Sequence, residues 1–214
     1  DLCAEFKYVS HEIVNGKYSI PGLPSVYDDE GKSQTLIVTL IDNAANMGIW
    51  LYYGVFEDLD IITRSAEIIS AGSEMVWLRK ASSMCLELTY GNWDMIHFHG
   101  SHCMERQPER IKLFHGVHTL ISGRGMSSHQ HNPFIIICDH DATEDSGTCY
   151  GMMLMYSGNH KTEVERDQFE SVRVVMGLND DRFRWELTSG ASFHTPEVIL
   201  TCADGLTELS QRYH

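Results

Sequence analysis

Two histidines, His129 and His131, stand two residues apart in the stretch GRGMSSHQHNPFIIICDHD, residues 123–141. In an extended strand, residues i and i+2 point to the same face, so the two imidazoles would lie side by side. Neutral imidazole nitrogens are common ligands of zinc, iron and copper. The spacing therefore raises the question of a metal centre in a β-rich protein.

The metal hypothesis requires a carboxylate that the local sequence does not supply. Gly123, five residues and then His129 and His131 match the beginning of the cupin metal motif, G-x5-H-x-H. That motif continues with a glutamate three or four residues later, and these places hold Ile135 and Ile136. Two neutral ligands are too few for a tight divalent site, so we expect no metal and no other cofactor.

The same polar residues are better explained as a hydrogen-bond network at the entry to a strand, with direct ligand contact as an alternative. The residues expected to form this network are Ser127, Ser128, His129, Gln130 and Asn132.

A second polar cluster, CDHDATEDSGT at residues 138–148, contains four carboxylates. A calcium-binding EF-hand loop counted from Asp139 would need an oxygen ligand and then glycine at its fifth and sixth positions. Thr143 and Glu144 occupy these positions, so the motif fails. We interpret the segment as a solvated hairpin turn.

The third polar segment, HGSHCMERQPER at residues 99–110, is expected to be a loop held by Glu–Arg pairs between two strands. Polar loops on β scaffolds also reach into binding sites, which is the alternative. His102 and Cys103 cannot act as a base and a nucleophile, because adjacent residues of an extended segment point apart. Hydrolysis of a glycoside would need two convergent carboxylates, and the sequence nominates no such pair.

The elements that must position these residues are strands. Apolar and polar residues alternate at a period of two, and turn residues separate the segments at spacings of about ten residues, as in a sandwich or barrel. A helical pattern begins only at residue 205. The predicted strands are 35–42, 48–56, 60–70, 75–80, 83–89, 95–99, 117–121, 133–139, 148–156, 162–167, 171–178, 183–187 and 196–202.

Composition narrows the class of protein. The 214 residues carry 16 basic and 30 acidic side chains, a formal charge of −14, which argues against nucleic acid and anionic membrane as partners. No leader sequence heads the chain, and no apolar run approaches the ~18 residues that a membrane helix needs. The apolar fraction of 43% is enough for one large domain.

The six cysteines show no C-x-x-C pairs, and several lie inside apolar segments. We interpret them as free thiols in a reducing compartment and expect a cytoplasmic protein. Cys138 and Cys149 flank the acidic turn and could face each other across a hairpin.

Both ends of the chain look cut, so we expect a piece of a longer protein. The chain starts without Met, and Leu206, Leu209 and Tyr213 recur at helical spacing near the end. We expect this helix to stop before it can pack on anything.

Five segments resemble the N-terminal domain of the family 36 α-galactosidases, and on this resemblance the chain is identified as a member of that family. The likeness runs from about Tyr8 to Tyr213. In chain order the segments are YVSHEIVNGKYSIPGLPSVY, VFEDLDIITRSAEI, RGMSSHQHNPF, YGMMLMYSGNHKTEVERDQFESVRVVMGLN and FRWELTSGASFHTPEVIL.

The resemblance implies an all-β fold, a large β-supersandwich of two packed, mainly antiparallel sheets over residues 1–204. It implies that residues 205–214 start a helix leading to an absent (β/α)8 barrel. In this family two aspartates of the barrel hydrolyse terminal α-linked galactose with retention, from oligosaccharides such as melibiose, raffinose and stachyose. The chain alone is therefore expected to hold no catalytic residue. Family members are commonly oligomers, so the full-length protein is expected to be a homo-oligomer.

One sugar-contacting position of the family falls inside the chain. In well-studied members a tryptophan in a GAWGRER-like loop lines the sugar pocket, and the matching loop here is GSHCMER. His102 occupies the tryptophan position and is the candidate substrate-binding residue. A histidine can still hydrogen-bond a sugar hydroxyl, although it offers less stacking area than an indole. Cys103, Glu105 and Arg106 are expected to shape the loop.

The alternative function is a stand-alone carbohydrate-binding module that uses tryptophans as stacking platforms. We expect most tryptophans of such a chain to pack in its core instead. The candidates are Trp50, Trp77, Trp93 and Trp185.

Overall fold

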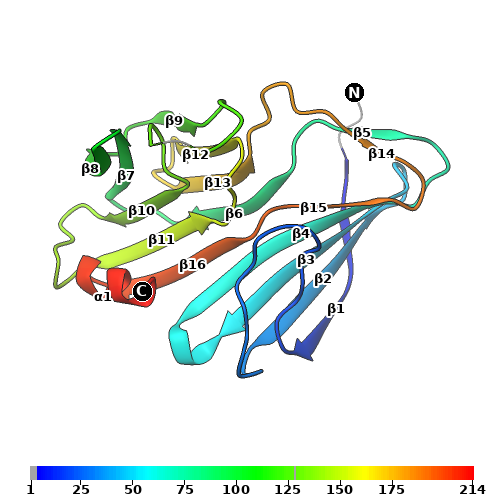
Figure 1. Ribbon diagram of the computed structural model, residues 1–214, viewed down its shortest axis with the longest axis horizontal. Helices are drawn as coiled ribbons and strands as arrows, with labels where there is room; N and C mark the ends of the chain where they lie inside the picture. Colours follow the sequence, from blue (N-terminus) through cyan, green and yellow to red (C-terminus); the bar gives the residue numbers. More distant parts are fainter. Residues whose placement is uncertain (1–3, 128) are drawn as a thin grey trace.

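The computed structural model describes residues 4–127 and 129–214, and within them the fold is dominated by one very wide antiparallel sheet (Figure 1). Every strand pair of this sheet is antiparallel. Its strands, in spatial order, are β1 (Lys7–Asn15), β2 (Gln34–Asp42), β3 (Met47–Phe56), β4 (Ile61–Ser70), β16 (Val198–Asp204), β11 (Thr148–Leu154), β10 (Phe134–Asp139), β7 (Trp93–Ser101) and β8 (Met104–Lys112), and β15 (Ser192–His194) also pairs with β4.

A second sheet of four strands packs against the part of the large sheet that contains β16, β11, β10 and β7 (Figure 1). Its strands, in spatial order, are β6 (Ser82–Leu88), β13 (Val172–Leu178), β12 (His160–Arg166) and β9 (Gly116–Ile121). A small ribbon is formed by β14 (Trp185–Leu187) and β5 (Val76–Leu78), and a 3-10 turn, η1 (Glu57–Leu59), joins β3 to β4.

The main core lies between the two sheets and follows the alternation of the strands. On β10, Ile135 and Ile137 point into this core and contact the same cluster as Val164 of β12 and Val174 of β13. All four are fully buried. Such packing explains why the period-two pattern was a good guide, and the predicted β-supersandwich of packed antiparallel sheets is confirmed.

Helix α1 (Leu206–Arg212) packs on the opposite face of the large sheet, over β10, β11 and β16. Leu209 is buried there, and the Tyr213 ring meets Phe134 edge-on with 5.0 Å between ring centroids. Gly151 of β11 makes room for this ring, because a Cβ at Gly151 would lie 2.6 Å from Cε2 of Tyr213. The expectation that this helix would have nothing to pack on is therefore wrong.

Three strands escaped the sequence pattern, and each lacks a buried alternating face. Every residue of β1 is exposed, because β1 is an edge strand of the large sheet. At the other edge, β8 is exposed except for Ile111 and contains Pro108, a residue that sheets tolerate at their edges. The third, β15, is only three residues long.

The long connection between β1 and β2 is tied down by a buried ion pair. The ammonium of Lys17 lies 2.5 Å from Oε1 of Glu197, and the two side chains are 5% and 0% exposed. Oε2 of Glu197 accepts a hydrogen bond from the backbone N–H of Val26 at 2.6 Å. Burial lowers the pKa of Lys17, although its hydrogen bond and attraction to Glu197 oppose this. Glu197 therefore holds two points of one connection against the start of β16.

The five cysteines among the described residues are free thiols. Cys138 and Cys149 are direct partners across β10 and β11, and both are fully buried. Burial raises the pKa of the Cys138 thiol to about 12, so this thiol is protonated at neutral pH. The acidic segment between these strands is an exposed turn, as predicted. None of the helices formed by the described residues is long and apolar enough to cross a bilayer.

Candidate functional site

The segment predicted to be a loop held by Glu–Arg pairs is instead a β-hairpin, and His102 lies at its tip. Ser101 and Met104 pair across the turn, so β7 and β8 are joined by His102 and Cys103 alone. The register shifts beside Gly100, where an added Cβ would collide with the carbonyl of Met104. His102 is exposed, and the N–H of Cys103 donates to Oε1 of Glu105 at 2.9 Å.

The base of this hairpin is fixed by one arginine. Nε of Arg110 on β8 donates to Oδ2 of Asp94 on β7 at 2.8 Å. The remaining guanidinium nitrogens donate to the carbonyl oxygens of Asp139, His140 and Ala142 at 2.7–2.9 Å. The root of the hairpin is thus rigid, while its tip projects as an exposed finger.

Along β7, from the root of the hairpin toward its tip, the side chains on the inner face change from apolar residues to histidines. Trp93 and Met95 belong to the main core, and the next two residues with the same alternation are His97 and His99. Their ring centroids are 6.0 Å apart. Glu109 of β8 pairs in register with His97 and places Oε2 at 3.5 Å from His97 Nε2 and 3.7 Å from His99 Nε2.

These side chains line a cleft of about 470 Å³, together with Gln107, Gln130 and His131. His131 belongs to the pair that first suggested a metal, whereas His129 is exposed. In the part of the chain that the structure describes, no three His, Cys, Asp or Glu residues stand close enough to hold a metal ion as they are arranged here.

Among the described residues, those predicted to form a polar network at 127–132 bond mainly to other segments, and mostly through the backbone. The N–H groups of Ser127 and Asn132 donate to the carbonyls of Ser157 and Phe98 at 2.7 and 3.1 Å. The side chain of Gln130 accepts from Arg124 at 2.5 Å. Ser128, also assigned to this network, lies outside the described residues. The segment does lead into a strand, β10, as predicted.

Three imidazoles at this end of the sandwich share a lowered pKa. Burial lowers the pKa of His97, an effect that His99 and His131 reinforce and Glu109 opposes. Burial, with smaller contributions from His99 and Arg124, lowers the pKa of His131. Burial also lowers the pKa of His160, whose Nε2 lies 3.3 Å from the carbonyl oxygen of His131. The fold therefore favours the neutral form of all three.

We expect the folded chain to lose stability on acidification from about pH 7 to about pH 5. In this range the unfolded state takes up protons at imidazoles of ordinary pKa 6.5, whereas the folded state resists protonation of His97, His131 and His160. Stability is present above the ordinary pKa and falls as the pH falls through the folded values. Urea midpoints measured across this range test the sign. His97→Gln should reduce the pH dependence, and His11→Gln, at an exposed position of β1, should leave it unchanged.

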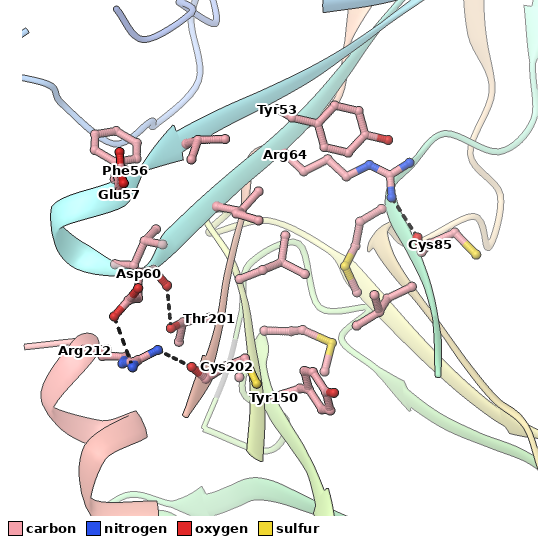
Figure 2. Close-up of a pocket in the computed structure, with 18 residues that line it drawn as sticks. Tyr53, Phe56, Glu57, Asp60, Arg64, Cys85, Tyr150, Thr201, Cys202 and Arg212 are labelled. Atoms are coloured by element: carbon pink, nitrogen blue, oxygen red, sulfur yellow. Dashed lines mark hydrogen bonds and ion pairs between the residues drawn. The ribbon is translucent and has the colours of Figure 1, made fainter. Parts of the chain in front are cut away.

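A second concavity is an apolar groove of about 560 Å³ between β3 and β4 on one side and β6, β11 and β16 on the other (Figure 2). Polar contacts mark its two ends. Arg212 of α1 lies 3.1 Å from Asp60, and Arg64 reaches across from β4 to donate to the carbonyl of Cys85 on β6 at 2.7 Å (Figure 2). The residues that line the groove are mostly apolar, and the Asp60 carboxylate at its edge is already paired with Arg212.

The tryptophans do not form a common platform. Trp93 is buried and donates through Nε1 to the carbonyl of Thr89, while the Arg184 guanidinium lies 3.8 Å from the ring centre of Trp77. Trp50 is half-buried, and Trp185 is 49% exposed and packs on Phe193. Of the four candidates, Trp185 alone is classed as exposed, and Trp50 and Trp77 are half-buried.

Comparison with known proteins adds one consistent result. Residues 1–188 match the sequence model of the glycosyl hydrolase family 36 N-terminal domain. The chain is 46% identical over 212 residues to the bifunctional alpha-galactosidase/sucrose kinase AgaSK of Mediterraneibacter gnavus. This alignment covers 99% of the chain and 23% of AgaSK. The chain is 41% identical over 209 residues to the alpha-galactosidase Mel36A of Lactobacillus acidophilus, 97% of this chain and 29% of that protein.

Solved structures agree. The crystal structure of the GH36 alpha-galactosidase AgaA of Geobacillus stearothermophilus superposes with a TM-score of 0.98 at 39% identity, over 100% of this chain and 30% of AgaA. The galactosidase domain of AgaSK gives a TM-score of 0.96 at 45% identity, over 99% of this chain and 30% of that domain. The chain thus spans less than a third of each of these relatives.

Proposed function

Because the chain belongs to the glycosyl hydrolase family 36 N-terminal domain family, we propose that it serves as the non-catalytic N-terminal domain of an α-galactosidase. The observation that carries this proposal is the agreement with AgaA over 100% of the chain at a TM-score of 0.98. The whole protein would hydrolyse terminal α-linked galactose with retention, through residues of a barrel domain that follows this one.

The proposed substrates are α-galactoside oligosaccharides. Variants of AgaA have been crystallised in complex with raffinose and with stachyose, and these variants match the present chain at 39% identity. An enzyme with this N-terminal domain is therefore best tested first with raffinose, stachyose and melibiose.

The whole protein and the 214-residue chain should be assayed side by side with an aryl α-galactoside and with raffinose. We expect turnover by the whole protein and none by the chain alone, because the carboxylate pair that glycoside hydrolysis needs belongs to the barrel. Turnover by the isolated chain would contradict the assignment of a non-catalytic domain, and an inactive whole protein would contradict the proposed activity.

Within this domain, His102 is the proposed contribution to the wall of the sugar site. Its support is the position at the exposed tip of a hairpin whose root is fixed by Arg110. An imidazole there can donate to or accept from a hydroxyl of the substrate.

In the whole protein, His102→Ala is expected to raise KM for raffinose roughly fivefold and to leave kcat nearly unchanged. One hydrogen bond to substrate, of about 1 kcal/mol, would be lost equally in the ground state and the transition state. Steady-state kinetics measure KM and kcat separately. Thr119→Ala, at an exposed position of β9, is the matched control and should not change KM. An unchanged KM for His102→Ala would remove this residue from the site.

A stand-alone carbohydrate-binding module is the second candidate, and its support is the exposed face of Trp185. Calorimetry of the chain with galactose separates the two functions. A saturable heat that Trp185→Ala abolishes would favour the module, and the absence of heat would favour the α-galactosidase domain.

We further propose a cytoplasmic location and a homo-oligomeric whole protein. The buried, unbonded thiols of Cys138 and Cys149 support a reducing compartment, because directly paired cysteines are the ones that an oxidising environment would join. The exposed apolar side chains of Tyr8 and Ile13 on the edge strand β1 support contact with further copies. Light scattering of the whole protein tests the oligomeric state, and fractionation of the cells that produce it tests the location.

A further inference from the structure

We propose that His97, His99 and Glu109 form a binding site for a divalent transition-metal ion, of which Zn²⁺ is the best suited. The proposal stands on the geometry of this chain and does not depend on the α-galactosidase assignment. The proposed site uses a different H-x-H pair from His129 and His131: the two imidazoles are on β7, and the carboxylate is Glu109 on β8.

The separations between ligand atoms support the site. With metal–ligand distances of about 2.0–2.2 Å, two ligand atoms of a tetrahedral zinc site lie roughly 3.3–3.5 Å apart. Oε2 of Glu109 lies 3.5 Å from Nε2 of His97 and 3.7 Å from Nε2 of His99. Two of the three edges of a His2Glu ligand set therefore already have nearly the right length.

The third edge, between the two imidazoles, has to close on binding. Their ring centroids are 6.0 Å apart with 44° between the ring planes, and as they stand the three groups do not surround one point. The His99 side chain is 44% exposed and that of Glu109 52%, whereas that of His97 is 11% exposed. Packing thus fixes His97 and leaves the two other ligands free to turn toward it.

The chemistry of the cleft also calls for a cation. One carboxylate oxygen faces two imidazole nitrogens, at distances too long for strong hydrogen bonds. Two imidazole nitrogens and one carboxylate oxygen make a donor set that transition-metal ions favour. The cleft is open to solvent on the side of Glu109 and His99, which gives an ion a route of entry.

A bound ion would join β7 to β8 just below the hairpin tip. His99 lies three residues before His102, and His97 and Glu109 are direct partners in the register of the two strands. The cross-link would hold the tip in one position relative to the root fixed by Arg110 and Asp94. The ion would therefore act on the hairpin without contacting His102.

The test uses the 214-residue chain, stripped with a chelator and titrated with ZnCl₂ by calorimetry at neutral pH. We expect one saturable site per chain, and a tetrahedral cobalt absorption spectrum when Co²⁺ replaces Zn²⁺. His99→Ala and Glu109→Gln, which change half-exposed side chains, should each weaken binding at least about tenfold. Far-UV circular dichroism identical to that of the unchanged chain will show that these variants are folded.

His129→Ala is the matched control, because it removes an exposed histidine of the other H-x-H pair. It should leave the affinity unchanged. The proposal is overturned if no saturable binding occurs, if Glu109→Gln binds as tightly as the unchanged chain, or if His129→Ala weakens binding as much as His99→Ala does.

Discussion

Replacing Glu197 by glutamine is expected to lower the free energy of unfolding by about 3–5 kcal/mol, because it leaves the buried ammonium of Lys17 without its counter-charge. Both side chains are at most 5% exposed, so water cannot take the place of the carboxylate. Glutamine has nearly the same shape and can still accept the hydrogen bond from Val26. The expected loss of stability therefore measures the effect of removing the charge, with side-chain packing nearly unchanged.

Urea unfolding followed by tryptophan fluorescence measures this effect, and two further variants sharpen it. Lys17→Met combined with Glu197→Gln should recover more than half of the lost stability, since no unpaired charge remains buried. Lys32→Met removes the exposed pairs to Glu30 and Asp58 and should cost far less stability than Glu197→Gln, because solvent screens exposed charges. If Glu197→Gln and Lys32→Met have equal effects, the Lys17–Glu197 pair does not fasten the connection between β1 and β2.

Leu209→Ala is expected to destabilise the chain by about 2–5 kcal/mol, the range for removing a fully buried leucine side chain. Leu209 is 1% exposed and packs with Ile136, Cys138 and Ala203 against the outer face of the large sheet. The result bears on where the domain ends, because a boundary at residue 204 would leave α1 as the beginning of a connector.

Ser210→Ala is the matched control for α1, since Ser210 is exposed and the substitution keeps the helix. It should change the unfolding free energy by no more than about 0.5 kcal/mol. If Leu209→Ala is as mild as Ser210→Ala, α1 is a detachable connector. A large difference would make α1 an integral part of the β domain.

Most of the strands that were predicted correctly carry buried side chains. In β13, Val172, Val174 and Met176 are buried at alternate positions, so the period of two is visible in the sequence. Residues 135–138 of β10 are instead a continuous apolar run that is buried on both faces. Edge strands lack this signal. In β8 the pattern MERQPERIK resembles a polar loop, and only the pairing with β7 makes it a strand.

The candidate site was only partly accessible from the sequence. His102 could be singled out by resemblance to a family loop, and HFH at residues 97–99 has the same spacing as His129 and His131. Glu109 lies next to His97 and His99 because of the pairing register of the β7–β8 hairpin. That register includes a shift beside Gly100 that no local sequence pattern predicts. Glu197 and Val26 are 171 residues apart, so their contact leaves no local signal at all.

The contact between Gly151 and Tyr213 has a consequence for the evolution of the chain. The Tyr213 ring lies so close above Gly151 that any larger residue at position 151 would displace the ring, together with the end of α1. A side chain can be gained at position 151 only if one is reduced at position 213. Among descendants of this sequence that keep the helix against the sheet, the two positions are expected to change together, although 62 residues separate them.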